Sequence, residues 1–211
     1  MSHLIRSYGL TSYHALLGDL RSAHGHLSRC TSTALGKIGQ VPERWGAHLK
    51  RLKVEFGADR PPTIAKASER LGEVVNMAAT LERMIDAVHW FSSQEEYAHL
   101  AVLECHPTTG STEKGNDLVL GEGPTAPRVL VEVTDVVSDS AGQNGKELKD
   151  LASLGCDALV PQDGVRRYLC TSEEFAAALT SRDRKWGRYH YRYRVTPIGD
   201  AGTHLLEICQ G

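Results

Sequence analysis

The sequence predicts a helical N-terminal half followed by an α/β half. Between residues 62 and 91, apolar side chains recur at a 3-4 spacing over about four heptads, which is the pattern of one long helix with a single apolar seam. From about Ser92 the texture changes to short apolar runs separated by Gly, Pro, Asp and Ser, which is typical of alternating strands and helices. We therefore expect a helical domain over residues 1–92 and an α/β domain over residues 93–211.

The long helix is the best-marked element of the first half, and Pro61 and Pro62 stand where it should begin. Its seam consists of Ile64, Ala67, Leu71, Val74, Ala78, Leu81, Ile85 and Val88. The stretch from Leu10 to Leu27 repeats the spacing less regularly, and residues 41–56 can add a short helix. The first half is thus expected to be a helical hairpin or small bundle. The seam either packs within the chain or forms a homodimer through the 62–91 helix, and spacing alone does not separate these alternatives.

The second half is expected to begin with a helix from Gln94 to Glu104 that can turn into a strand near its end. The predicted strands cover residues 116–121, 128–137, 166–171, 189–197 and 204–209, and the predicted helices cover residues 145–154 and 172–181. Ser172 is placed to cap the last helix, since Glu173 and Glu174 follow in its first turn. This alternation indicates an α/β sheet.

Composition restricts the choice of partner and compartment. Of 211 residues, 41% are apolar and 24% are charged, with a formal net charge of -2, so the surface is not basic throughout and any nucleic acid must bind a local patch. No apolar run reaches membrane-spanning length, and the opening stretch lacks the apolar region of a signal peptide. The five cysteines include no CxxC spacing. We expect reduced thiols, a cytoplasmic location and no membrane partner.

Two carboxylates suggest a metal site. Asp117 opens one predicted strand and Glu132 lies in the middle of the next, so a tight turn between the strands can bring both to one end of the sheet. Carboxylate oxygens suit a hard divalent cation such as Mg²⁺ or Mn²⁺. The backbone carbonyl of Val133, beside Glu132, can complete the ligand set.

The segments 115–120 and 129–134 that carry these carboxylates resemble the active-site hairpin of the PD-(D/E)XK, or restriction-endonuclease-like, nuclease superfamily. The predicted order helix, strand, strand, helix, strand is similar to that family's core and covers about half of the chain. The resemblance implies a restriction-endonuclease-like mixed sheet flanked by helices. It also implies that Asp117 is the metal-binding aspartate and Glu132 the acidic residue of the (D/E)-x-K element.

The chain departs from the family pattern at Thr134, which stands where the lysine is expected and cannot supply a positive charge. In the family this lysine is sometimes relocated to the following helix. Lys146 and Lys149 lie on the helix predicted there, and Lys114 is a third candidate. Lys146 is the first choice for the missing cation.

A basic segment near the C-terminus bears on the partner. On a strand, Arg188, Arg192 and Arg194 share one face, while Tyr189, Tyr191 and Tyr193 share the other. A cationic stripe of this kind can contact phosphates. The alternative is an edge strand whose charges prevent aggregation.

These observations and the resemblance together predict a Mg²⁺-dependent endonuclease that cuts DNA, with RNA as a second substrate class. An enzyme of this kind would serve in restriction or defence. The main alternative is a catalytically inactive nuclease-fold protein that binds or regulates through its helical domain. A helical scaffold with an accessory α/β domain is the third interpretation. Metal binding separates the first from the other two.

Overall fold

The structure, a computed structural model, describes residues 11–40, 64–106, 116–123, 125–134, 154, 164–180, 192–200 and 202–209. The described helices are α1 (Tyr13–Gln40), α3 (Ile64–Ser93) and α5 (Glu173–Thr180). The strands are β1 (Ala101–Cys105), β2 (Leu118–Gly123), β3 (Ala126–Val133), β4 (Arg166–Ser172), β5 (Arg192–Ile198) and β6 (Thr203–Cys209). The α/β class predicted from the sequence is therefore confirmed.

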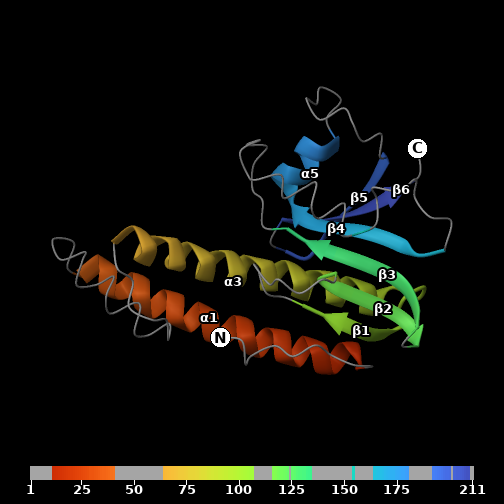
Figure 1. Cartoon of the computed structure of the whole chain (residues 1–211), viewed down its shortest axis with the longest axis horizontal. Coiled ribbons are helices and arrows are strands. Elements are labelled where there is room, and N and C mark those ends of the chain that lie inside the picture. Colours follow the sequence, from red (N-terminus) through yellow and green to blue (C-terminus); the bar gives the residue numbers. More distant parts are fainter. Residues whose placement is uncertain are drawn as a thin grey trace.

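The long helix is confirmed as α3, which lies alongside α1 (Figure 1). Leu81 and Val88 of the predicted seam are fully buried, but the buried stripe is wider than predicted and includes Met84, Ala87 and Phe91. The reason is that α3 packs against α1 on one side and against the sheet on another. Over residues 81–91 the seam thus packs within the chain, and a homodimer through this helix stays a prediction.

The sheet has six strands in the order β1-β2-β3-β4-β6-β5. The β3–β4 pair is parallel, and the other neighbouring pairs are antiparallel. It follows that β1, β3, β4 and β5 all end at one edge of the sheet, which we call the carboxyl edge. A parallel pair needs a crossover connection. The helix predicted at 145–154 falls in this connection and, apart from Leu154, lies outside the described residues.

One hydrophobic core unites the two helices with one face of the sheet. It joins Leu16 and Leu20 of α1, Phe91 of α3, and Val129 and Val131 of β3. The boundary expected at residue 92 therefore does not separate two hydrophobic cores. On the opposite face of the sheet, α5 packs through a second cluster made of Leu169, Phe175, Ala176, Leu179 and Leu206 (Figure 1).

The helix predicted for residues 94–104 is wrong over most of its length. The α3 helix ends at Ser93, a turn follows, and Ala101–Cys105 forms β1. Pairing with β2, in which Val102 lies opposite Leu120, outweighs the local preference for a helix. The strands agree with prediction to within a few residues. The predicted helix cap is also confirmed, because the Phe175 backbone N–H donates to Ser172 Oγ at 3.2 Å.

Within the described parts of the chain, none of the helices has the length and apolar character needed to cross a membrane. Cys105, Cys170 and Cys209, the cysteines whose side chains are described, are free thiols, as predicted. Burial is the main cause that raises the pKa of Cys105 to about 12, so this thiol stays protonated at neutral pH.

Candidate functional site

Asp117 directly precedes β2 and Glu132 is the last residue but one of β3, so both residues belong to the carboxyl edge. Leu118 lies opposite Val131 in the antiparallel β2–β3 register, so the next position sets Asp117 opposite Glu132. Oδ2 of Asp117 accepts a hydrogen bond of 2.7 Å from the Val133 backbone N–H. The Asp117 backbone carbonyl accepts another, of 2.8 Å, from the His106 N–H. Hydrogen bonds from both neighbouring strands thus fix Asp117 where β3 ends.

Glu132 occupies the face of the sheet that α1 and α3 do not cover. Val129, Val131 and Val133 of β3 point into the core shared with the helices, so the alternation of side chains directs Leu130 and Glu132 to the other face. The sequence carries the same alternation, since valines occupy every second position from 129 to 133. Glu132 is only 6% exposed. A carboxylate at that depth is costly to desolvate unless a cation or several hydrogen-bond donors accompany it.

Thr134, the position at which the resemblance leads us to expect a lysine, is closed to solvent. Thr134 is fully buried, and its backbone N–H donates to the Cys170 carbonyl of β4 at 2.9 Å. A cation at this end of the site must therefore come from another part of the chain. The predicted substitutes Lys146 and Lys149 lie outside the described residues, as does Lys114.

The donor chemistry at the edge fits a hard cation. The two carboxylates and the backbone carbonyl predicted at Val133 offer oxygen atoms only, the ligands that Mg²⁺ and Mn²⁺ prefer. No group of three or more His, Cys, Asp or Glu side chains that could hold a metal occurs among the residues that the structure describes. An ion bound to the pair would therefore complete its shell with the carbonyl, water and phosphate oxygens.

The predicted cationic stripe is only partly visible. Arg188 and the side chain of Arg192 lie outside what the structure describes. Arg194 is 71% exposed and donates to Glu207 Oε2 at 3.1 Å. Tyr193 packs on the opposite face, as the alternation predicted. Arg194 lies near the start of β5, the end away from the carboxyl edge, so the structure does not bring it to the acidic pair.

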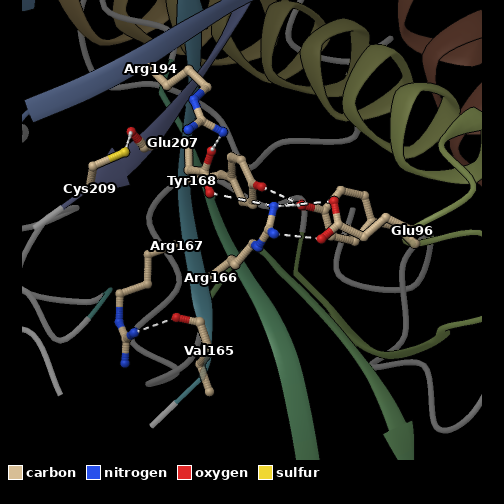
Figure 2. Close-up of polar contacts among 9 residues, drawn as sticks. Glu96, Val165, Arg166, Arg167, Tyr168, Arg194, Glu207 and Cys209 are labelled. Carbon is tan, nitrogen blue, oxygen red and sulfur yellow. Dashed lines mark hydrogen bonds and ion pairs between the residues drawn. The ribbon is translucent and has the colours of Figure 1, made fainter. Parts of the chain in front are cut away.

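A second polar site, which the sequence analysis missed, is a pocket of about 530 Å³ between the end of α3 and strands β4, β6 and β5. Arg166 is central to it (Figure 2). Its guanidinium forms an ion pair of 2.5 Å with Glu96, donates to the Tyr97 hydroxyl at 2.5 Å, and lies 3.6 Å from Glu207. The sequence did show two arginines, Arg166 and Arg167, at the start of a predicted strand. It did not show which residues these arginines would contact.

The charged and phenolic groups of this pocket satisfy one another. The hydroxyls of Tyr97 and Tyr168 lie 2.7 Å apart, and burial raises the pKa of both tyrosines. A hydrogen bond with Tyr168 is the first cause that raises the pKa of Arg166. Because each cation already has a carboxylate or hydroxyl partner, we interpret the cluster as a structural network that holds the turn after α3 against the sheet.

Two charged residues of α3 also lie at the carboxyl edge and were missed. Asp86 Oδ2 accepts a hydrogen bond of 2.6 Å from Thr203 Oγ1, at the start of β6. The Arg83 backbone carbonyl accepts a bond of 3.5 Å from the Cys170 thiol of β4. The available signal was that Arg83 and Asp86 are three residues apart, the spacing that puts two side chains on the same side of a helix.

Comparisons with known proteins find no match: no family model, no curated protein and no solved structure is similar to the chain. The function is therefore inferred from the geometry of the site.

Proposed function

We propose that the chain is a metal-dependent phosphodiesterase that cuts DNA, with Asp117 and Glu132 at its centre. The observation that supports this proposal is the β2–β3 register, whose last pair is Leu118 with Val131, so that the next positions along the two strands are 117 and 132. Ligands of open α/β sheets bind outside the carboxyl ends of the strands. The edge that holds both carboxylates is thus the edge where a substrate is expected.

The pair has the chemistry to hold Mg²⁺ or Mn²⁺, with the Val133 carbonyl as a third ligand. When bound, such an ion supplies Lewis acidity and lowers the pKa of a coordinated water. The Val133 N–H keeps the Asp117 carboxylate oriented toward the end of β3. Burial of Glu132 keeps competing water away and strengthens the attraction between this carboxylate and a cation.

Positive charge is needed to offset the charge that develops on the phosphate oxygens. Lys146 and Lys149 belong to the connection that leaves β3 at the carboxyl edge, so this proposal keeps them as candidates. Arg188 and Arg192 are retained as contacts to the nucleic-acid backbone. Arg194 is a weaker candidate for that role, since Glu207 already neutralises it.

A catalytically inactive binding protein on the same fold is the second candidate. One observation favours it: Thr134 replaces the lysine and is fully buried, so catalytic charge cannot be restored at that position. In that case Asp117 has only a structural role, through its hydrogen bond to β3, and the surface that binds a partner is formed by α1 and α3.

The test is cleavage of duplex DNA, single-stranded DNA and RNA with Mg²⁺ or Mn²⁺, comparing the wild type with Asp117→Asn and Glu132→Gln. Glu122→Gln is a matched control, because Glu122 is an exposed carboxylate of β2 far from the carboxyl edge. We expect a metal-dependent cut that both site variants lose and the control keeps. Absence of cleavage on all three substrates, together with no Mn²⁺ binding by calorimetry, would favour the binding protein.

A further inference from the structure

Arg83 lies in the turn of α3 that meets the carboxyl edge. Its backbone carbonyl accepts the Cys170 thiol hydrogen bond at 3.5 Å, and the Cys170 carbonyl in turn accepts the Thr134 N–H at 2.9 Å. Asp86, one turn further along α3, bonds to Thr203 at the same edge. Arg83 is thus two hydrogen bonds away from the end of β3, where the Asp117 carboxylate is held.

The guanidinium of Arg83 differs from the other arginines of the described sheet and helices. Its Nη1 atom is buried and has no hydrogen-bond partner among the described residues, while the residue as a whole is half-buried. By contrast, Arg167 donates to the backbone carbonyls of Leu154 and Val165 at 2.7 Å each, and Arg166 has several partners. A buried donor without a partner costs free energy, and an anionic ligand bound there would offset that cost.

The direction of the side chain favours this edge as the place where the ligand binds. Long side chains on a helix lean toward its N-terminus. The N-terminal part of α3 runs on past the sheet on the side of the carboxyl edge (Figure 1). Burial is the main cause that raises the pKa of Cys170, while the positive charge of Arg83 lowers it and Asp86 and Asp117 raise it further. The charges of Arg83 and Asp117 therefore both act on this thiol, in opposite directions.

We propose that Arg83 binds a phosphate group at the carboxyl edge and provides there the positive charge that Thr134 does not. A guanidinium suits this task because its planar donors match two phosphate oxygens. The catalytic part of this inference rests on the proposed nuclease function, whereas phosphate binding itself does not. The phosphate can belong to a nucleic-acid backbone or be free phosphate, and the experiment separates these sources.

The experiment uses the full chain without metal and follows the arginine Nε–Hε signals by NMR during titration with inorganic phosphate and then with a short DNA duplex. We expect the Arg83 signal to shift with both ligands. For DNA we expect Arg83→Gln to weaken binding about tenfold and Arg83→Lys to recover part of the loss. Arg128→Gln is the control, since Arg128 is an exposed residue of β3 already paired with Glu122. A signal that shifts with phosphate but not with DNA assigns the site to free phosphate.

Metal-dependent cleavage distinguishes the two proposals. If the wild type cuts DNA, Arg83→Gln should reduce the rate by roughly 10²-fold or more, as removal of one transition-state donor does, and should leave Mn²⁺ affinity unchanged. Unchanged cleavage in Arg83→Gln would overturn the inference while the nuclease stands. Phosphate binding at Arg83 in a protein that neither cuts nor binds metal would refute the nuclease and retain the phosphate site.

Thermal unfolding distinguishes a ligand-binding arginine from a structural one, because the two predict opposite changes in the unfolding midpoint when Arg83 is replaced. Arg83→Met keeps the apolar stem and removes the buried Nη1 donor that lacks a partner, so without ligand it should raise the unfolding midpoint by roughly 2–4 °C. A lower midpoint in both Arg83→Met and Arg83→Lys would show that the guanidinium is needed for folding, and would overturn the inference. The same scans establish that each variant used for binding is folded.

Discussion

Thr203 Oγ1 donates a hydrogen bond of 2.6 Å to Oδ2 of Asp86, and this contact joins the start of β6 to the C-terminal part of α3. Burial raises the pKa of Asp86, the hydrogen bond from Thr203 opposes that shift, and the charges of Glu82 and Asp200 add to it. The Asp86 carboxyl group, whose pKa is raised, therefore connects α3 to the edge of the sheet that holds the candidate site.

This shift predicts how stability depends on pH. Because folding raises the pKa of Asp86 above its unfolded value of about 3.9, the stabilisation it adds is complete below that value. It is lost as pH rises through the folded pKa. We expect Asp86→Asn, which keeps an acceptor for Thr203, to raise the unfolding midpoint at pH 7 and to reduce its change between pH 4 and 7. The control is Glu95→Gln, because Glu95 is exposed and is not among the groups that shift the pKa of Asp86. A lower midpoint at pH 7 in Asp86→Asn would contradict the prediction.

Gly199 should tolerate no side chain. It has φ of +66°, and a Cβ built there would lie 2.3 Å from Asp86 Cγ. Gly202 has a similar φ of +69°, but a Cβ there would meet nothing within 4 Å. We expect Gly202→Ala to cost about 1 kcal/mol, the left-handed penalty alone, and Gly199→Ala about 1–3 kcal/mol more, measured by denaturant unfolding. Equal losses in the two variants would show that Gly199 does not contact Asp86.

The hydroxyl pair formed by Tyr97 and Tyr168 should contribute to stability as a unit. Tyr97→Phe removes the oxygen that both the Tyr168 hydroxyl and Arg166 contact, while the ring keeps its edge-to-face packing 5.2 Å from Phe91. We expect each Phe variant to lose about 1 kcal/mol of unfolding free energy. The double variant should lose less than the sum, because the shared bond is removed only once. Strict additivity in a double-mutant cycle would argue against this network.

The structural role of Asp117 can be separated from its proposed role as a metal ligand. Asp117→Ala removes the acceptor for the Val133 N–H and should cost about 1–3 kcal/mol of unfolding free energy, whereas Asp117→Asn retains an acceptor and should cost less. Mg²⁺ at about 100 times its dissociation constant should stabilise the wild type by about 2.7 kcal/mol and should not stabilise Asp117→Asn. The measurement is denaturant unfolding with and without Mg²⁺. Equal stabilisation of the two proteins would exclude Asp117 as a ligand.

The sequence by itself determined those features that depend on local periodicity. The 3-4 spacing was enough to predict α3, and alternation of valines in β3 assigned Glu132 to the face opposite Val131, because a helix or strand directs its side chains by a fixed repeat. Ser172 marked the start of α5 for a similar reason, since capping involves residues three apart.

Tertiary structure alone decided which elements became neighbours. Residues 101–105 are a strand because β2 pairs with them, and Asp117 lies opposite Glu132 because of the register between β2 and β3. Arg83 and Asp86 reach the carboxyl edge only because of where α3 crosses the sheet. Local spacing specifies the direction of a side chain. Its partners depend on contacts between residues far apart in the chain, such as the 117 positions that separate Asp86 from Thr203, and no local repeat encodes these.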